Sequence, residues 1–333
     1  MGKEGKALGG MVMPLFLKGK RVLVTGASGF IGSHVAERLV KAGNRVAVMV
    51  RQDSDLWRLK DFKDRLSLCR GDLRVQQDVE NCVGTVRPEY VFHMGAYGVD
   101  SRHTDPVQAV STNVLGMVFL VKSLLQAGCK KLINVGSCME YGNKDIQVKE
   151  DAHLEPFNIY GSSKAAGSII AHQLAAEHGL PVVTLRAFGV FGEREGCHKF
   201  FPHIILSILQ GKEVKLTGCE QYRDYCYVDN LVDAIFLAAG NEECQNDIFN
   251  VGSGTIRPLR DYVEMVYQRM DSPVKPQYGA IPYRPVEFWR PWPDTEKIRA
   301  TLQWKPRISL EEGLDRTIDW YKRNLDKYLG TKR

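Results

Sequence analysis

The sequence predicts an α/β fold, with a doubly wound parallel sheet and a smaller, discontinuous C-terminal domain. Short apolar runs alternate with stretches of helical periodicity through the first half of the chain, which is the pattern of strands and covering helices in a parallel sheet. A glycine-rich turn joins the first run to the first helical stretch, and 333 residues exceed the usual size of one domain. We expect an N-terminal extension at 1–18, a sheet domain at 19–190 and 224–255, and a second domain at 191–223 and 256–330.

The glycine-rich turn follows the apolar run that starts at Val22, and it places Gly26, Gly29 and Gly32 three residues apart. A tight turn, a close backbone approach to a diphosphate and close helix–strand packing each exclude a Cβ atom. The helix expected over His34–Ala42 begins at this turn, so its unpaired N–H donors favour an anion. The turn is one residue longer than G-x-G-x-x-G, and a glycine-rich turn without a ligand is the alternative.

The second expected strand, Arg45–Val50, ends at Arg51. In a doubly wound sheet, the residue that closes this strand faces the ribose of a dinucleotide. An acidic residue there accepts a hydrogen bond from the 2′-hydroxyl of NAD, and an arginine accommodates the 2′-phosphate of NADP. Arg51 therefore favours NADP(H), and Ser54 and Arg58 could add phosphate donors. NAD(H) stays open because Asp53, two residues on, could serve the ribose instead.

The remaining periodicities place further elements in the first half of the chain. We expect strands at 66–69, 90–94 and 131–135, and long helices at 105–126 and 158–177. Pro106 in the first turn and Gly128 just past the end support the first long helix. Because ligands bind where the carboxyl ends of parallel strands meet, the residues after each strand are the candidates for a site.

Composition excludes some classes of function. The net charge of +6 is spread along the chain, which argues against a nucleic-acid partner. Eight cysteines without a C-x-x-C pair or a metal-ligand spacing predict reduced thiols in a cytoplasmic protein and no metal site. The apolar stretch Met11–Leu17 is too short to span a bilayer, so we expect no membrane partner and a loosely ordered extension.

Tyr160 and Lys164 lie four residues apart in the second long helix, which places both side chains on one face. A phenol has an ordinary pKa of about 10, and a nearby ammonium would favour its phenolate. Ser137, after the strand at 131–135, could hydrogen-bond the same substrate oxygen. A surface pair on a helix is the alternative interpretation.

An ordered series of short motifs extends from about Lys18 to Tyr321. It comprises Gly26-x-x-Gly29-x-x-Gly32, Asp72-Leu73, His93-Met-Gly-Ala96, Asn113, Ser137, Tyr141-Gly142, Tyr160-x-x-x-Lys164, Arg186 and Arg223-Asp-Tyr-Cys-Tyr-Val-Asp229. The series resembles the extended short-chain dehydrogenase/reductases that act on nucleotide sugars. The resemblance implies a Rossmann domain that binds NAD(P), a smaller domain that holds a nucleotide sugar, and a homodimer formed through the two long helices. Helices that only cover the sheet are the alternative to the dimer.

The resemblance also implies the roles of individual residues. Ser137, Tyr160 and Lys164 take the catalytic roles, and Lys164 also holds the nicotinamide ribose. The other residues at the cofactor, with Arg51 added from its place after the second strand, are Gly26, Gly29, Phe30, Ile31, Gly32, Asp72, Leu73, Gly95 and Ala96. The residues at the substrate are Asn113, which supports the active-site end of its helix, and Lys199, Phe200, Pro202, Arg223, Arg284 and Arg290.

The arginines of the substrate side suit a diphosphate, because guanidinium groups pair with phosphates through forked hydrogen bonds. Packing on Trp289 and Trp292 is the competing explanation for Arg290. Gly189 stands where relatives often have asparagine, so that usual contact to the substrate phosphates is missing or moved to the backbone.

Three functions remain open. The first is NADPH-dependent reduction of a nucleotide-linked 4-keto-6-deoxyhexose, the reaction of the abequose and paratose synthases, which the motifs resemble most. The second is an NAD-dependent nucleotide-sugar 4-epimerase, and the third is a binding protein without turnover, which the intact catalytic residues disfavour. A 4,6-dehydratase is disfavoured because Cys138 and Met139 replace its Asp-Glu pair, and neither side chain is an acid–base group at neutral pH.

Overall fold

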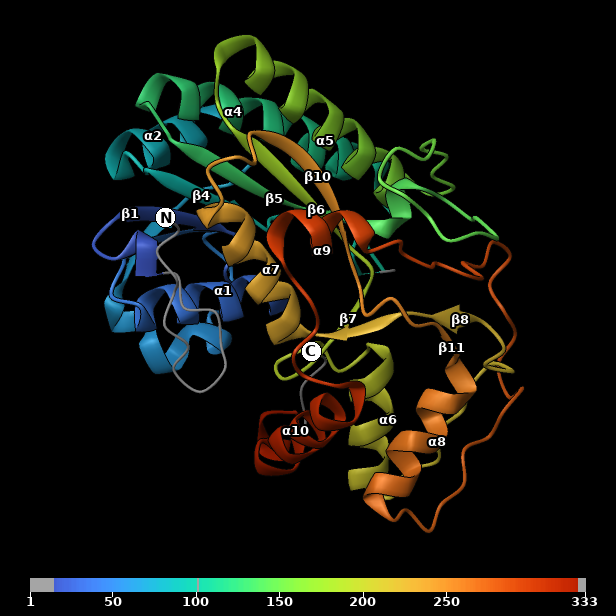
Figure 1. Ribbon diagram of the computed structural model, residues 1–333. Helices are drawn as coiled ribbons and strands as arrows, with labels where there is room; N and C mark the ends of the chain where they lie inside the picture. The colour runs from blue at the N-terminus through green and yellow to red at the C-terminus, as the bar shows by residue number, and fades with distance from the viewer. Residues whose placement is uncertain (1–14, 101, 329–333) are drawn as a thin grey trace.

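The computed structural model describes residues 15–100 and 102–328, and its centre is a seven-stranded parallel sheet (Figure 1). The strand order is β10-β6-β5-β4-β1-β2-β3, and every neighbouring pair is parallel. The strands are β1 (Arg21–Thr25), β2 (Arg45–Val50), β3 (Leu66–Arg70), β4 (Tyr90–His93), β5 (Lys131–Ser137), β6 (Val182–Ala187) and β10 (Asn246–Val251). The predicted doubly wound sheet is confirmed.

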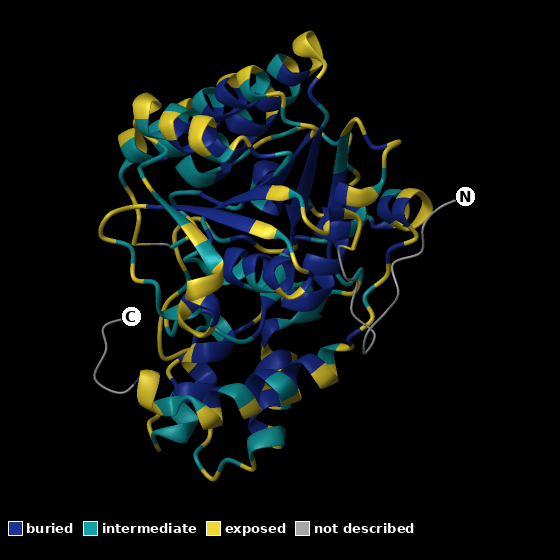
Figure 2. Ribbon diagram, turned by 90° about the vertical axis from the view of Figure 1, so that its left-hand side faces the viewer, coloured by how far each residue is buried: buried dark blue, intermediate teal, exposed yellow. Residues whose placement is uncertain are grey.

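Helices cover both faces of this sheet (Figure 1). One face carries α1 (Phe30–Lys41) and α7 (Val228–Gly240). The other carries α2 (Gln76–Val86), α3 (Pro106–Val110), α4 (Gly116–Ala127) and α5 (Ile159–His178). Strands and inner helix faces are buried while the outer helix faces are exposed (Figure 2), so each side of the sheet has its own apolar core.

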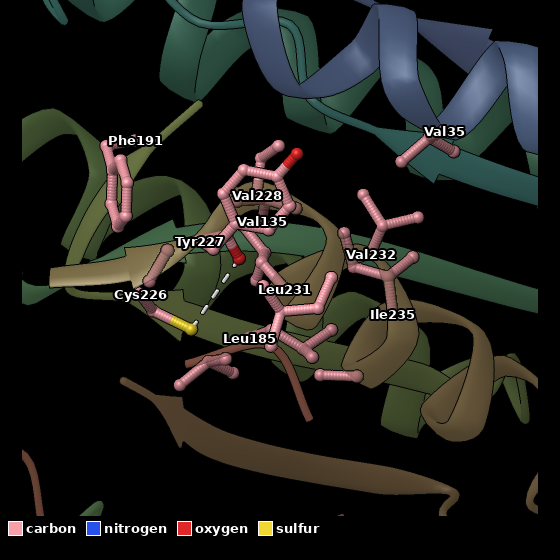
Figure 3. Packing of buried hydrophobic residues seen from close by; sticks show 14 of the residues in the cluster. Val35, Val135, Leu185, Phe191, Cys226, Tyr227, Val228, Leu231, Val232 and Ile235 are labelled. Atoms are coloured by element: carbon pink, nitrogen blue, oxygen red, sulfur yellow. Dashed lines mark hydrogen bonds between the residues drawn. The ribbon is translucent and has the colours of Figure 1, made fainter. Parts of the chain in front are cut away.

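The sequence after β6 builds a second group of helices beside α7 (Figure 1). It contains α6 (Phe200–Leu209), α8 (Leu259–Met270) and α10 (Leu310–Arg323), while α9 (Glu296–Leu302) packs against β10. Two short ribbons join this group to the sheet: β7 (Gly189–Phe191) with β9 (Tyr225–Tyr227), and β8 (Tyr222–Arg223) with β11 (Arg257–Pro258). Phe191 and Tyr227 of the first ribbon continue the core of Val228, Leu231 and Ile235 on α7 (Figure 3).

Several boundaries differ from the expected ones. The first helix begins at Phe30 rather than His34, because Gly29 is its N-cap and Gly32 lies inside its first turn. The helix expected over 105–126 contains a π-helical turn, Ser111–Leu115, between α3 and α4. Short 3₁₀ turns also occur at Leu15–Leu17, Trp57–Arg65, Cys138–Glu140 and Leu325–Lys327.

The expected N-terminal extension is partly built into the fold. Residues 1–14 lie outside the described residues, but Leu17 has no exposed surface and belongs to the core around α1 and α7. The expectation of loose order is therefore wrong for Leu17, because the apolar end of the segment is buried.

The helical run Pro106–Ala127 is long and apolar enough to cross a membrane by length and composition. Leu120, Val121 and Leu124 in this run have no exposed surface and pack against the sheet. Packing in the core therefore accounts for its apolar composition.

Candidate active site

The glycine turn between β1 and α1 packs tightly against the loop after β4. A Cβ atom on Gly26, whose φ is +69°, would lie 2.6 Å from the amide nitrogen of Gly95, and one on Gly32 would lie 2.3 Å from the Gly26 carbonyl oxygen. The Thr25 hydroxyl accepts from the Gly95 amide at 3.3 Å. A Cβ on Gly95 would lie 2.7 Å from Leu73, so four residues predicted at the cofactor meet here.

The N-terminus of α1 opens at this turn. Gly29 caps the helix without a side-chain hydrogen bond, and Phe30 and Ile31 form its first turn. Helical N–H donors without a capping side chain, together with the helix dipole, favour an anion. The residues present therefore fit the pyrophosphate of a dinucleotide, with Ala96 half-buried on the neighbouring loop.

A hollow of about 420 Å³ lies beyond the ends of β2 and β3, and Arg51, Arg70, Asp72 and Arg74 are among its lining residues. Burial alone would raise the pKa of Asp72, but hydrogen bonds from Arg74 lower it below its ordinary value. Arg51 lies 3.4 Å from Asp53 in an exposed ion pair. Arg70, which the sequence did not bring forward, donates to the carbonyl oxygens of Arg51 and Gln52 at 2.9 and 3.3 Å.

Arg70 could have been identified from the sequence, because it is the last residue of a strand that pairs with β2. The end of β3 lies beside the end of β2 in a parallel pair, so its last side chains share a site with Arg51. Arg58 behaves differently from the expectation. Instead of facing this hollow as a phosphate donor, it donates to the carbonyl oxygens of Ser28 and Arg194.

The three predicted catalytic residues converge at the carboxyl end of β5. Ser137 ends that strand and lies close enough to Tyr160 on α5 to lower the pKa of its phenol. Lys164 lies one turn further along α5 and is 5% exposed. The predicted grouping on one helix face is therefore present in the structure.

The expectation that Lys164 favours the phenolate of Tyr160 is wrong. Burial raises the pKa of Tyr160 above its ordinary value, and the nearby Ser137 offsets this only in part. Burial also lowers the pKa of Lys164, against the nearby charge of Glu140. The site keeps the phenol protonated rather than ionised, because removal from water disfavours the phenolate more than its neighbours favour it.

Glu140 organises the turn that carries Ser137. Its carboxylate has no exposed surface, accepts from the Ser137 amide at 2.8 Å and pairs with Arg186 Nε at 2.8 Å. Arg186 also donates to the Tyr141 hydroxyl at 2.8 Å, and that hydroxyl donates to Asn250. Sequence reasoning missed Glu140, although a charged residue after one buried strand and an arginine inside the next indicate an internal pair.

Cys138 and Met139 follow Ser137 directly. Burial raises the pKa of the Cys138 thiol to about 12, so it is not an acid–base group at neutral pH. The carboxylate of Glu140, next along, is occupied by Arg186 and the Ser137 amide. The geometry thus agrees with the expectation that the acid and base of a dehydratase are missing at these positions.

Asn113 lies in the π-helical turn, and its side-chain amide is bonded within the chain. It accepts from the Tyr97 amide, and it donates to the Tyr97 carbonyl and to the Ser163 hydroxyl, each at 2.8 Å. These bonds connect the loop after β4 to α5. They match the expected support of the helix, while contact of Asn113 with a substrate stays a prediction.

The residues predicted for the substrate come from segments far apart in the sequence. Lys199 donates to the Val99 carbonyl at 2.7 Å, Phe200 stacks on Tyr225 with ring centroids 5.9 Å apart, and Pro202 is buried in α6. The charge of the exposed Arg284 contributes to a lowered pKa of Lys199, whose main cause is burial.

Arg223 and Arg290 lie beside the same ribbon. Arg223 is 3.2 Å from Glu287, and Arg290 stacks over the ring of Tyr222 at 4.7 Å. The alternative that placed Arg290 on Trp289 or Trp292 is wrong, because β8 presents Tyr222 to it.

Gly189 is explained by its neighbours. A Cβ atom there would lie 2.3 Å from the Asp224 carbonyl oxygen and 2.8 Å from the Tyr225 ring. An asparagine would not fit, because the Tyr225 ring fills its space.

A family model described as "NAD dependent epimerase/dehydratase family" matches residues 22–252. UDP-glucose 4-epimerase of Mycolicibacterium smegmatis is 28% identical over 91% of this chain and 98% of its own length. A trifunctional UDP-glucose 4,6-dehydratase, 3,5-epimerase and reductase of Arabidopsis thaliana is 26% identical over 92% of this chain, which spans only 47% of it.

Solved structures agree with the observed fold. UDP-glucose 4-epimerase from Thermotoga maritima, with UDP-glucose, has 28% identity and a TM-score of 0.85 over 91% of this chain and 99% of that one. UDP-glucose 4-epimerase from Thermus thermophilus, complexed with NAD, has 30% identity and a TM-score of 0.83 over the same shares. With the glycine turn and the Ser137, Tyr160 and Lys164 group in place, this chain belongs to the NAD dependent epimerase/dehydratase family.

Proposed function

We propose that the protein reduces the 4-keto group of a nucleotide-linked 4-keto-6-deoxyhexose with NADPH. The observation that carries this proposal is the arginine-lined hollow beyond β2 and β3. Arg74 is matched by Asp72 and Arg51 by Asp53, but the Arg70 guanidinium bonds only to neutral carbonyl oxygens within the described part of the chain. A 2′-phosphate suits this place, and NADPH is the form of the cofactor that a net reduction consumes.

The chain's own groups suit a proton donation. Tyr160 holds its proton because burial raises its pKa, and the effect of Ser137 on that pKa shows that the two side chains are close. In the proposed reaction, Tyr160 gives a proton to the substrate oxygen while Ser137 hydrogen-bonds the same oxygen and Lys164 holds the nicotinamide ribose. The cofactor, when bound, supplies the hydride to the adjoining carbon.

The substrate's diphosphate would lie among the cations of the second domain. Lys199, Arg223, Arg284 and Arg290 come from three separate segments around Tyr222 and Tyr225. Glu287 pairs with Arg223 in the structure, so a bound diphosphate would compete with this carboxylate for the guanidinium.

We also propose the homodimer through the two long helices. Val107, Val110 and Leu115 on the first long helix and Ile169 on α5 are large apolar side chains with exposed fractions of 42–70%. Burying them against the same helices of a second copy would remove this apolar surface from water.

The test is a turnover assay with a nucleotide-linked 4-keto-6-deoxyhexose and NADPH. Oxidation of NADPH in a one-to-one ratio with product, and little oxidation of NADH, is the expected result. Consumption of neither cofactor with this substrate would contradict the proposal.

The second candidate is an NAD-dependent nucleotide-sugar 4-epimerase, and relatives that are UDP-glucose 4-epimerases support it. Ser137, Tyr160 and Lys164 are also sufficient for that chemistry, provided that the keto sugar can turn over in the site. Interconversion of two hydroxylated nucleotide sugars with no net change in added cofactor would select the epimerase and exclude the reductase.

A further inference from the structure

A cavity of about 600 Å³ shares the Tyr225 ring with the substrate side of the site described above. Its walls are β9, the loop and ribbon at 253–257, Tyr262 of α8 and the segment 299–311, which connects α9 to α10 along the front of the molecule in Figure 1. None of the residues predicted for catalysis, cofactor or substrate lines it. The volume is in the range of small-molecule sites.

Three of the residues that line this cavity are cationic, Arg257, Arg299 and Lys305. Within the described part of the chain, their side chains form no hydrogen bond, no ion pair and no contact with an aromatic ring. Glu311 is the acidic residue of the lining, and it sits in the first turn of α10, where the helix dipole already favours it. Among the residues that line the cavity, cationic residues therefore outnumber acidic ones.

Several other polar groups of the wall are bonded within the chain. The Ser253 amide donates to Asp224 behind the wall at 2.6 Å, and the Trp304 indole donates to the Asn230 carbonyl at 2.9 Å. The Tyr262 hydroxyl donates to the Arg223 carbonyl at 2.9 Å. The donors left for a ligand include the cationic groups, which bind phosphate oxygens well.

The wall that carries Arg257 is held in place before any ligand binds. The backbone of Arg257 in β11 lies opposite that of Arg223 in the antiparallel strand β8. The hydrogen bond from the Tyr262 hydroxyl to the Arg223 carbonyl supports this ribbon. The backbone that carries this cation therefore need not be ordered when an anion binds.

We propose that this cavity binds a small phosphorylated anion through Arg257, Arg299 and Lys305. The site is separate from the proposed reductase chemistry and does not depend on it. An anion of at least two negative charges matches the excess of positive charge, and its phosphate oxygens accept from the guanidinium and ammonium donors.

The experiment is a calorimetric titration of the NADP⁺-saturated full chain with inorganic pyrophosphate. Arg257→Gln/Lys305→Gln should weaken one binding event by about 100-fold, since each charge-assisted hydrogen bond lost costs roughly tenfold. Lys305→Gln alone, at an exposed position, should cost about tenfold and covers the case in which the double variant fails to fold. Lys322→Gln, an exposed lysine of α10 outside the cavity, is the matched control and should leave the isotherm unchanged.

The comparison remains valid when pyrophosphate also binds at the catalytic cleft. The cavity variants weaken binding in the cavity and leave binding in the cleft unchanged. A crystal structure with pyrophosphate should show it against Arg257 and Lys305. Superimposable isotherms of the wild type and the folded cavity variants would overturn the proposal, and so would pyrophosphate bound elsewhere with the cavity empty. Neither result would bear on NADPH-dependent turnover.

Discussion

Replacing Glu140 by alanine tests how the catalytic turn is held. Glu140 and Arg186 are 0% and 3% exposed, and the carboxylate accepts both from Arg186 Nε and from the Ser137 amide at 2.8 Å. Removing one partner of a buried ion pair costs about 3–5 kcal/mol. The unpaired Ser137 amide adds a further cost of about 1–3 kcal/mol.

The expected loss for Glu140→Ala is therefore at least about 3 kcal/mol in the free energy of unfolding. Thermal unfolding followed by circular dichroism should show this as a drop in Tm of about 5–15 °C. Glu155→Ala, which removes an exposed partner of Lys144 from the same region, is the matched control. It should cost less than about 1 kcal/mol, because surface ion pairs contribute little.

A double variant separates stability from positioning. Glu140→Leu/Arg186→Met replaces the buried pair by apolar side chains, which often restores stability. It still leaves the Ser137 amide without an acceptor, so turnover should stay low while the Tm recovers only in part. A Tm of Glu140→Ala equal to that of the wild type, or full activity of the double variant, would refute the reasoning.

Three further predictions concern chemistry, cofactor and pH. Tyr160→Phe should keep cofactor binding and lose turnover by roughly 10²–10⁴-fold, as measured by NADPH oxidation, and near-normal activity would remove Tyr160 from the mechanism. Arg51→Asp should reverse or flatten a preference for NADPH over NADH in fluorescence titrations, since the carboxylate would repel the 2′-phosphate; equal affinities in the wild type would contradict the role of Arg51. Burial raises the pKa of Glu195 to about 8, so the folded state keeps a proton that the unfolded state loses near pH 4.5, and stability falls as pH rises between these values. Glu195→Gln should therefore raise the Tm at pH 9 and change it little at pH 4, and an equal effect at both would show that Glu195 ionises normally.

The sequence by itself determined the sheet and predicted the family's motif residues. Periodicity placed β2 at its observed bounds and the long helix at 158–177 within one residue at each end, because strands and helices repeat their apolar positions at different intervals. The glycines were identifiable because only backbone without Cβ atoms allows the approach of Gly26 to Gly95. The ordered motifs predicted the family to which the chain belongs.

Only the tertiary structure decided which side chains contact one another. Periodicity cannot show that Glu140 and Arg186 pair, that Arg70 joins Arg51, or that the Tyr225 ring excludes an asparagine at 189. Helical periodicity predicted that Lys164 lies on the same helix face as Tyr160, but it could not predict the burial that raises the pKa of the phenol. These features depend on how far each group is removed from water and on partners distant in the sequence, and both are set when the strands and helices pack together.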